Sequence, residues 1–340
     1  MKLEYGVNIA GTETFRFAMN KNPFGKGCNG QTLPKSLRYY LVPPPGRIFA
    51  CGDLSQAEAR VVAYLARCKD LIELFNDSTR HVHKENAIVV FGHEVEKDSP
   101  EYVLAKQVIH ASNYRMGAYR FAVHTGLDVA TCKQLLNNYH AKRPEIRKWH
   151  DWVWNEIRER GFLTTPLGDK RVFYEAIAAF SSQGKMLDTH WKDTIAWCPQ
   201  TTVPHVTNIG IIETAKEVNG QDSVTWPEQT EWPNLKHFAW WHHQGHDSFL
   251  ASIPEGSEQE FAKVVQKKFA VPLLINGMEF TIPMELGFGY NFGDFHPDDG
   301  SIVTRSKWDD WLNAKLAKKP READILRGIY GTHLKDWRPL

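Results

Sequence analysis

The stretch that decides the fold lies at residues 47–60 and reads RIFACGDLSQAEAR. Its first part, Arg47–Gly52, is a short apolar run of the kind that forms a buried strand. Asp53 closes this run, and then Ser55 and Glu58 stand at the spacing of a helix capping box. The pattern predicts a strand that leads directly into a helix, with a carboxylate at the end of the strand.

A second aspartate, Asp247, lies in the run Gln244-Gly245-His246-Asp247-Ser248. The segments on either side, 238–243 and 249–253, have the composition and length of strands, so we expect a β-hairpin with Asp247 at or near its turn. If this hairpin pairs with the strand that ends at Asp53, the two carboxylates approach each other. Paired carboxylates suit Mg²⁺, which prefers oxygen ligands, and two-ion sites of this kind serve phosphoryl transfer.

Between the two aspartates, residues 80–160 have a mostly helical pattern with few prolines. One helix is expected to begin at Ser99-Pro100-Glu101, because serine is a good N-cap and proline fits the first turn. Lys106, His110 and Tyr114 follow at intervals of four, which places them in one stripe along the helix. A lysine in such a position can neutralise triphosphate charge, and a tyrosine can pack against a base.

The composition is that of a globular chain. The 340 residues include 42% hydrophobic and 24% charged residues, and the net charge is +1. A local basic cleft is compatible with this balance, because acids elsewhere cancel the sum. The sequence has no apolar run of the ~20 residues that a membrane span needs and no signal-peptide core. Five cysteines without C-x-x-C spacing are typical of free thiols in a cytoplasm, here the host cytoplasm if the source is viral.

In their order along the chain, these motifs resemble those of family A DNA polymerases, the group of bacterial DNA polymerase I and several phage replicative polymerases. The run Asp53–Arg60 is similar to motif A, Lys106-x3-His110-x3-Tyr114 to motif B, and His246-Asp247-Ser248 to motif C. The resemblance runs from about Gly11 to Asp294. Supporting matches occur in the expected order at Thr12–Arg16, Gln31–Pro34, His83, Leu167–Arg171 and Gln200.

The resemblance implies an α+β right-hand polymerase core, with an antiparallel palm sheet, inserted helical fingers and no thumb. The implied boundaries are 1–63 and 200–296 for the palm, 64–199 for the fingers with the motif B helix at about 101–118, and 297–340 for a C-terminal extension. In the family a thumb and usually an exonuclease domain precede the first motif, where this sequence has only about ten residues. We therefore expect a separately encoded thumb or exonuclease chain as a partner.

The resemblance also implies roles for individual residues. Asp53, Asp247 and the Leu54 carbonyl would hold two Mg²⁺ ions, and Lys106 would complete the catalytic set. The residues that would contact the incoming deoxynucleoside triphosphate are Leu54, Gln56, Glu58, His83, Lys106, His110 and Tyr114, with Glu58 disfavouring a ribose 2′-hydroxyl. The residues that would contact primer–template DNA, chiefly its backbone and minor groove, are Arg16, Gln31, Arg38, Gln200 and His246.

The function that these motifs predict is template-directed extension of a primer 3′ end by two-metal phosphoryl transfer. The alternative is a non-catalytic DNA-binding replication-accessory protein derived from a polymerase, against which the intact Asp53, Asp247 and Lys106 argue. The positions that depart from the family pattern are Phe15 and Arg115 (usually glycine), Tyr102 (usually arginine) and Ser248 (usually glutamate). The positive charge of Arg115 could replace that of the arginine that is missing at position 102, which in the family contacts the triphosphate.

The segment 297–340 lies beyond the resemblance. Four of its apolar residues fall on one helical face with lysines around them, and they are Trp308, Trp311, Leu312 and Leu316. This stripe predicts a helix that packs on the main body of the protein. A partner-binding helix is the alternative.

Overall fold

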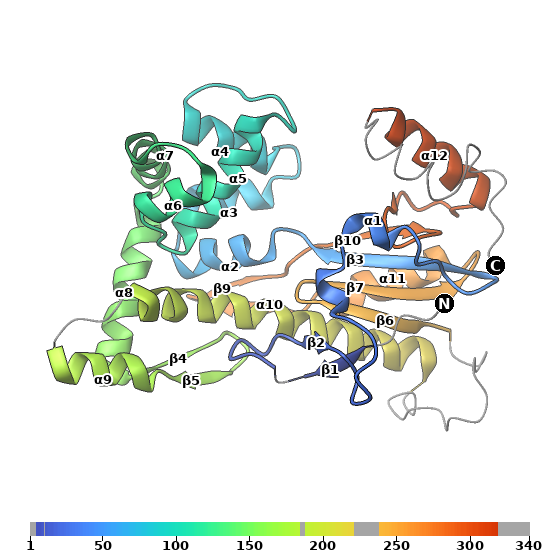
Figure 1. The fold of residues 1–340 in the computed structure, drawn as a ribbon, viewed down its shortest axis with the longest axis horizontal. Helices are drawn as coiled ribbons and strands as arrows, with labels where there is room; N and C mark the ends of the chain where they lie inside the picture. Colours follow the sequence, from blue (N-terminus) through green and yellow to red (C-terminus); the bar gives the residue numbers. More distant parts are fainter. Residues whose placement is uncertain (1–4, 10, 184–187, 221–237, 319–340) are drawn as a thin grey trace. The chain divides into compact units, whose positions relative to one another are not determined.

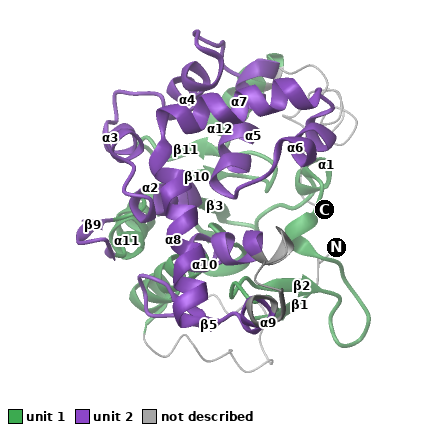
Figure 2. Cartoon of the chain, turned by 90° about the vertical axis from the view of Figure 1, so that its left-hand side faces the viewer, with its two compact units in different colours: residues 1–55, 204–271, 281–340 green, residues 56–203, 272–280 purple. Residues whose placement is uncertain are grey.

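The structure is a computed structural model that describes residues 5–9, 11–183, 188–220 and 238–318 (Figure 1). The chain divides into two compact units (Figure 2). Unit 1 consists of residues 1–55, 204–271 and 281–340, and unit 2 of residues 56–203 and 272–280. Residues 221–237 lie outside the described residues, as does the part of the segment 297–340 that follows Lys318.

Unit 1 is built on a five-stranded sheet with the strand order β11-β10-β3-β7-β6. Every neighbouring pair in this sheet is antiparallel, which confirms the predicted α+β class with an antiparallel sheet. The central strand β3 is the predicted strand of the opening motif. The five strands are β3 (Arg47–Leu54), β6 (Trp240–Gly245), β7 (Ser248–Pro254), β10 (Met284–Gly289) and β11 (His296–Pro297).

Alternation along β3 gives the sheet two different faces. One face carries Ala50 and Gly52 and packs against helix α11 (Glu258–Phe269), where the rings of Phe249 and Phe269 lie 5.3 Å apart. Gly52 lies opposite Phe249 in the register, and a Cβ at Gly52 would come within 2.3 Å of that ring. The residue before Asp53 must therefore be glycine, and Asp53 itself points to the opposite face.

The predicted hairpin is confirmed. Strands β6 and β7 pair with Gly245 opposite Ser248, so the turn consists of His246 and Asp247. His246 has a positive φ of 24°. Strand β3 pairs with β7 from Arg47 to Asp53, and this pairing places the Asp247 turn beside the end of β3.

The remaining elements of unit 1 surround this sheet. A second, two-stranded sheet pairs β1 with β2, and the first half of the unit also holds two short helical turns. Helix α10 begins in unit 2 and ends in unit 1. These elements are β1 (Gly6–Asn8), β2 (Ala18–Asn20), η1 (Gly30–Thr32), α1 (Lys35–Arg38), α10 (Asp188–Asn219) and α12 (Arg305–Ala317).

Helix α12 packs on unit 1, as the apolar stripe predicts. Trp308 and Leu312 are buried, and the Trp308 ring lies 5.8 Å from that of Tyr290. The buried carboxylate of Asp294 accepts a hydrogen bond from the hydroxyl of Tyr39 at 2.9 Å and pairs with the ammonium of Lys315 on α12. An ion pair therefore joins α12 to the end of the sheet region.

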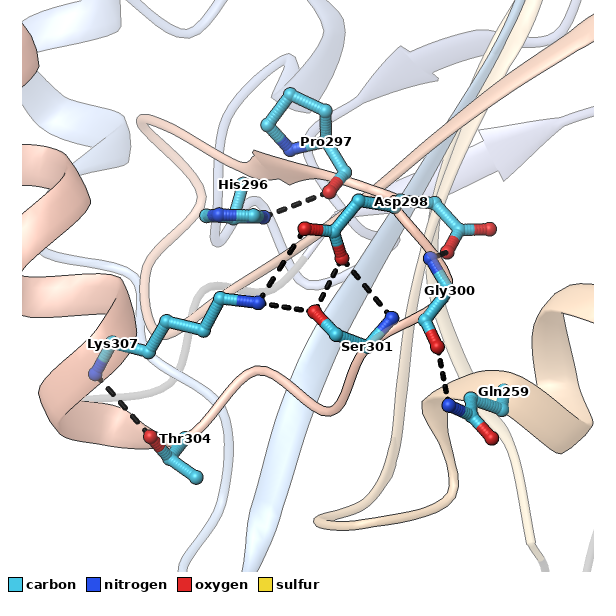
Figure 3. A network of polar contacts seen from close by, with 9 residues as sticks. Gln259, His296, Pro297, Asp298, Gly300, Ser301, Thr304 and Lys307 are labelled. Carbon is cyan, nitrogen blue, oxygen red and sulfur yellow. Dashed lines mark hydrogen bonds and ion pairs between the residues drawn. The ribbon is translucent and has the colours of Figure 1, made fainter.

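The loop between β11 and α12 is closed by its own polar groups (Figure 3). The backbone N–H of Gly300 donates to Asp298 at 3.0 Å, and Gln259 of α11 donates to the Gly300 carbonyl. The Thr304 hydroxyl accepts from the backbone N–H of Lys307 at 3.3 Å, which caps the first turn of α12. These bonds fix where the helix begins.

Unit 2 is mainly helical, and its core includes the buried side chains of Val108, Tyr139, Trp149 and Trp197. The helical pattern predicted over 80–160 is confirmed by five successive helices. The helices of unit 2 are α2 (Ala57–Leu65), α3 (Lys69–Asn76), α4 (Val82–Phe91), α5 (Pro100–Asn113), α6 (Ala118–Thr125), α7 (Val129–Lys142), α8 (Pro144–Arg160) and α9 (Tyr174–Gln183), with the start of α10. Its two hairpins are β4 (Phe162–Thr164) with β5 (Lys170–Val172) and β8 (Leu273–Ile275) with β9 (Met278–Phe280).

The predicted capping box at the start of α2 is wrong. The N-cap is Gln56, which has a positive φ of 50° and makes no side-chain cap hydrogen bond. The Ser55 hydroxyl instead donates to Glu285 Oε1 at 2.6 Å, and Glu58 accepts a hydrogen bond from the hydroxyl of Tyr114. Both side chains therefore bond to residues that are distant in the sequence, and the local capping box is not formed.

Helix α10 contains two prolines. It begins at Asp188 and continues through Pro199 and Pro204. A proline inside a helix removes one hydrogen bond, but Trp197 and Val206 are fully buried near the prolines, so tertiary packing keeps the helix continuous. Within the described parts of the chain, no helix combines the length and the apolar composition of a membrane span.

Gly210 of α10 gives a test of this packing. Alanine at a helix position is usually more stable than glycine by up to about 1 kcal/mol. A Cβ at Gly210, however, would lie 2.5 Å from the Phe269 ring. We expect Gly210→Ala to lower the free energy of unfolding by about 1–2 kcal/mol, because the ring cannot move without repacking. In denaturant titrations, adding Phe269→Leu should recover part of the loss, and a Gly210→Ala protein more stable than the wild type would contradict this packing.

Candidate active site

The two aspartates predicted to lie together do so in unit 1. Asp53 stands opposite Ser248 across the β3–β7 pair, and Asp247 is the neighbour of Ser248 in the turn. The backbone N–H of Leu54 donates to the Asp247 carbonyl at 2.8 Å, which ties the turn to the strand end. Asp53 is therefore carried on a paired strand and Asp247 on the turn that this bond ties to it, so the sheet and its hairpin set their relative position.

The electrostatics of this pair favour a bound cation. Asp53 is accessible to solvent at the strand end, but partial burial removes some of its hydration. This loss, followed by the negative charges of Asp247 and Glu285, raises the pKa of Asp53 to about 7. Loss of hydration also raises the pKa of Asp247, although the charges of His246 and Arg16 oppose it. A cation between such carboxylates would relieve their repulsion.

The donor set fits magnesium. Asp53, Asp247 and the Leu54 carbonyl offer only oxygen atoms, and Mg²⁺ in substrate sites is held by one or two carboxylates together with water and substrate phosphates. Among the residues that the structure describes, no group of three or more His, Cys, Asp or Glu side chains is arranged to hold a metal ion. The pair is thus suited to an ion shared with a phosphate ligand rather than to an ion fully enclosed by protein.

In unit 2, helix α5 carries the predicted stripe. The Ser99 hydroxyl accepts from a backbone N–H of the first turn at 3.2 Å, and a proline follows it, so the predicted start is confirmed. Lys106 and His110 are exposed on this helix, and Tyr114 is its buried C-cap. The rings of His110 and Tyr114 lie 5.0 Å apart in an edge-on arrangement.

Tyr102 brings two of the predicted triphosphate-binding residues together. The ammonium of Lys106 lies 4.6 Å from the centre of the Tyr102 ring, a distance at which a cation–π interaction holds. The ring of His83, from α4, lies 5.8 Å from the same ring. Tyr102, which stands where the family pattern has an arginine, therefore orients Lys106, one helical turn further along α5.

Glu58 and Tyr114 also come together in unit 2. Glu58 lies in the first turn of α2, and its carboxylate accepts a hydrogen bond from the Tyr114 hydroxyl. This bond joins the predicted ribose-discriminating residue to the end of α5. Gln56, just before it, holds a left-handed backbone conformation.

Most of the predicted DNA-contacting residues have structural partners. Gln31 donates to the Phe17 carbonyl at 2.9 Å and to the Gln244 carbonyl at 3.3 Å. Arg38 donates to the Leu33 carbonyl at 2.9 Å and lies 5.0 Å from the centre of the Phe292 ring. Arg16 and His246 are near enough to Asp247 for their charges to act on it.

Gln200 lies on α10 in unit 2, where it is half-buried. No distance in the structure tests its contact with DNA. The DNA contacts of all five residues therefore stay predictions.

The sequence patterns miss a basic cavity in unit 2. Its volume is ≈ 680 Å³, and seven of its fourteen lining residues are basic, against one acid, Asp151. The Arg115 guanidinium lies 4.5 Å from the centre of the Trp191 ring. The positive charge that we expected to contact the triphosphate is therefore in contact with Trp191 in this structure. Burial lowers the pKa of two of the histidines to about 4, which leaves them neutral. The basic residues are Arg115, Arg120, Lys133, His140, Arg147, His150 and Lys192.

Sequence patterns also miss Glu285. It lies on β10, directly opposite Asp53 in the register, and it accepts the Ser55 hydrogen bond. The only signal is a single acid inside the otherwise apolar stretch MELGFG. The pairing of β10 with β3, which makes this acid important, is not encoded locally.

The chain is similar in fold and in sequence to known DNA polymerases. The polymerase domain of Pol1 from M. smegmatis, solved in complex with DNA primer-template and dNTP, superposes with a TM-score of 0.67 at 19% identity, over 85% of this chain and 48% of that one. The DNA polymerase of Mycobacterium phage D29 is 31% identical over 145 residues, which are 42% of this chain and 24% of the relative. DNA polymerase I of Chloroflexus aurantiacus is 29% identical over 185 residues, which are 52% of this chain and 19% of the relative.

The chain thus spans about a fifth to a quarter of the length of these curated relatives. The family model described as DNA polymerase family A matches residues 4–294, which is most of the sequence and includes both aspartates and the α5 stripe. The chain belongs to DNA polymerase family A.

Proposed function

We propose that this protein is a template-directed DNA polymerase that adds deoxynucleotides to a primer 3′ end by two-metal phosphoryl transfer. The observation that carries the proposal is the pair Asp53 and Asp247, held on adjacent backbone by the Leu54 hydrogen bond and electrostatically disposed to bind a cation. The family membership gives the reaction class, and the M. smegmatis complex with primer-template and dNTP supports the same substrates here.

In this proposal unit 1 acts as the palm and holds the ions. Asp53, Asp247 and the Leu54 carbonyl would bind two Mg²⁺, which when bound supply electrostatic stabilisation for the attacking and leaving oxygens. The role of the sheet is to fix these ligands before substrate arrives, so little reorganisation is needed during the reaction. Strand pairing, which is rigid, suits this role better than a loop.

Unit 2 acts as the fingers and binds the incoming nucleotide. Lys106, oriented by Tyr102, and the nearby His83 would contact the triphosphate. His110 and Tyr114 present rings to the sugar and base, and Glu58 would occupy the place of a ribose 2′-hydroxyl. Such groups act by positioning the reactants and neutralising charge, which is most of what a protein contributes to phosphoryl transfer.

DNA would be bound mainly through its backbone. Arg16, Gln31, Arg38, Gln200 and His246 are the residues proposed to contact primer–template. The basic cavity of unit 2 adds an excess of positive charge that a net charge of +1 conceals. Contacts of this type hold DNA of any sequence and weaken with salt. A cytoplasmic location and a separately encoded thumb or exonuclease chain stay predictions.

Replacing Asp53 tests the reaction directly. Asp53→Ala should lower the primer-extension rate at least about a hundredfold, because loss of a metal ligand removes several kcal/mol of transition-state stabilisation. The assay uses a recessed primer–template, Mg²⁺ and deoxynucleotides, with Asp310→Asn as a control at an exposed acid of α12. Equal activity of wild type and Asp53→Ala would contradict the proposal. Absence of extension by the wild type would favour the non-catalytic DNA-binding protein.

The raised pKa of Asp53 predicts a pH-dependent need for metal. With a pKa of about 7, the carboxyl stays protonated to a higher pH than an ordinary aspartate, and only its ionised form binds a cation. As the pH falls below about 7, the half-saturating Mg²⁺ concentration should therefore rise by up to about tenfold per pH unit. Above about pH 8 it should be constant. Primer extension at several Mg²⁺ concentrations measures this, and a half-saturating concentration that does not change below pH 7 would contradict it.

Glu58 offers a test of sugar selection. Glu58→Ala removes the side chain proposed to exclude the 2′-hydroxyl, so incorporation of ribonucleotides relative to deoxynucleotides should rise about tenfold to a hundredfold. Single-nucleotide incorporation with each substrate measures the ratio. Glu73→Ala, at an exposed acid on α3, serves as the matched control. If the ratio changes equally in both variants, Glu58 has no special role in selection.

A further inference from the structure

Three side chains form a row across the sheet at the end of β3. Glu285 on β10, Asp53 on β3 and Ser248 on β7 occupy directly opposite register positions. Side chains at such positions point to the same face and have their Cβ atoms about 4.5–5.5 Å apart. Glu285 therefore stands on the same face as Asp53, the one opposite to α11, and its charge is among the two that raise the pKa of Asp53.

This arrangement is unfavourable for the sheet alone. Like charges directly opposite each other destabilise an antiparallel pair. Both side-chain charges that act on Asp53, those of Asp247 and Glu285, are negative. A bound cation would offset the repulsion between these acids at the end of β3.

Ser55 fixes the position of the Glu285 carboxylate. Its hydroxyl donates to Glu285 Oε1 at 2.6 Å, and its backbone N–H donates to the Pro283 carbonyl at 2.8 Å. The chain that leaves β3 is thus bonded twice to the segment around β10. The carboxylate is held beside Asp53, and one of its oxygens is used by the serine.

On the other side of Asp53 the row carries no charge. Ser248, on β7, donates its hydroxyl to the Gly245 carbonyl at 2.9 Å, within its own hairpin. Of the two residues opposite Asp53, only Glu285 adds negative potential to the face. The third acid of this site is therefore supplied by β10.

We propose that Glu285 is a positioning residue of the candidate active site, whose carboxylate, held by Ser55, strengthens the binding of divalent cations by Asp53 and Asp247. The inference rests on the proposed function, because it concerns the same ions. Glu285 acts through its charge on the cation and on Asp53, and one of its oxygens stays bonded to Ser55. A neighbouring charge at cross-strand distance in a partly solvated site changes the binding of a divalent ion by about tenfold.

The opposing interpretation is that Glu285 only anchors Ser55. The two interpretations differ in the ion binding that they predict for Glu285→Gln, whose amide oxygen can still accept from Ser55. If Glu285 acts through its charge, the variant should bind divalent ions more weakly and, because a like-charge repulsion is removed, should be at least as thermally stable as the wild type. If Glu285 is only an anchor, the variant keeps the Ser55 bond and should bind ions as the wild type does.

The test is titration of the full chain with Mn²⁺ in the absence of DNA, followed by the electron paramagnetic resonance signal of the free ion. Glu285→Gln should weaken Mn²⁺ binding about tenfold, and Ser55→Ala should weaken it less. Glu285→Asp, which keeps the charge, should bind nearly as the wild type. Glu260→Gln, at an exposed acid of α11, should be unchanged. Thermal unfolding of each variant is measured in parallel.

Primer extension gives the second readout. Glu285→Gln should raise the half-saturating Mg²⁺ concentration about tenfold, recover most of its rate at high Mg²⁺, and leave the KM for DNA unchanged. Wild-type Mn²⁺ affinity in Glu285→Gln, or no Mn²⁺ binding by the wild type, overturns the inference. A wild type that binds Mn²⁺ with this dependence on Glu285 but extends no primer contradicts the proposed function and leaves the role of Glu285 supported.

Discussion

The structure depends on the pairing of β3 with a strand on each side, because this pairing is what forces acids into proximity. Asp53 lies at the last but one position of the central strand, between Glu285 and Ser248, and the Leu54 amide draws in the Asp247 turn. Each pairing adds hydrogen bonds, and each also brings another acid near Asp53. These acids are Glu285 on β10 and Asp247 in the turn before β7. The sheet must be stable enough to tolerate this repulsion, and its other face provides that stability.

The opposite face shows how this stability is obtained. Gly52 leaves room for the Phe249 ring, which packs on Phe269 of α11, and Gly210 lets α10 approach the same ring of Phe269. Asp53 and Glu285 lie on one face of the sheet, and Gly52 and Phe249 lie on the other. Because side chains alternate along a strand, the position of Gly52 determines the face to which Asp53 points. A change that shifted the register of β3 by one residue would bury Asp53 and expose the glycine. Packing around two glycines therefore protects the position of the carboxylate.

Much of this site could be predicted from sequence, for reasons that the structure makes clear. Strand β3, the Asp247 hairpin and the start of α5 are encoded by local patterns, namely an apolar run, a turn between strands and a serine–proline cap. The errors occur where a distant residue competes with a local partner. Glu285 takes Ser55, and Tyr114 takes Glu58, so the capping box is not formed. Packing of buried residues likewise carries α10 through its prolines.

Tyr102 is compatible with the proposed role of α5 in binding a triphosphate. An arginine at that position would add a second charge, but a tyrosine fixes the one that remains, because the Lys106 ammonium lies over its ring. An ordered lysine loses less conformational entropy when it meets a phosphate than a freely moving one does. His83 packs against the same ring, so its imidazole also lies near Tyr102. Tyr102 is itself buried beside Ala87 and Ala105, so in the proposed function it orients the lysine instead of adding a second charge.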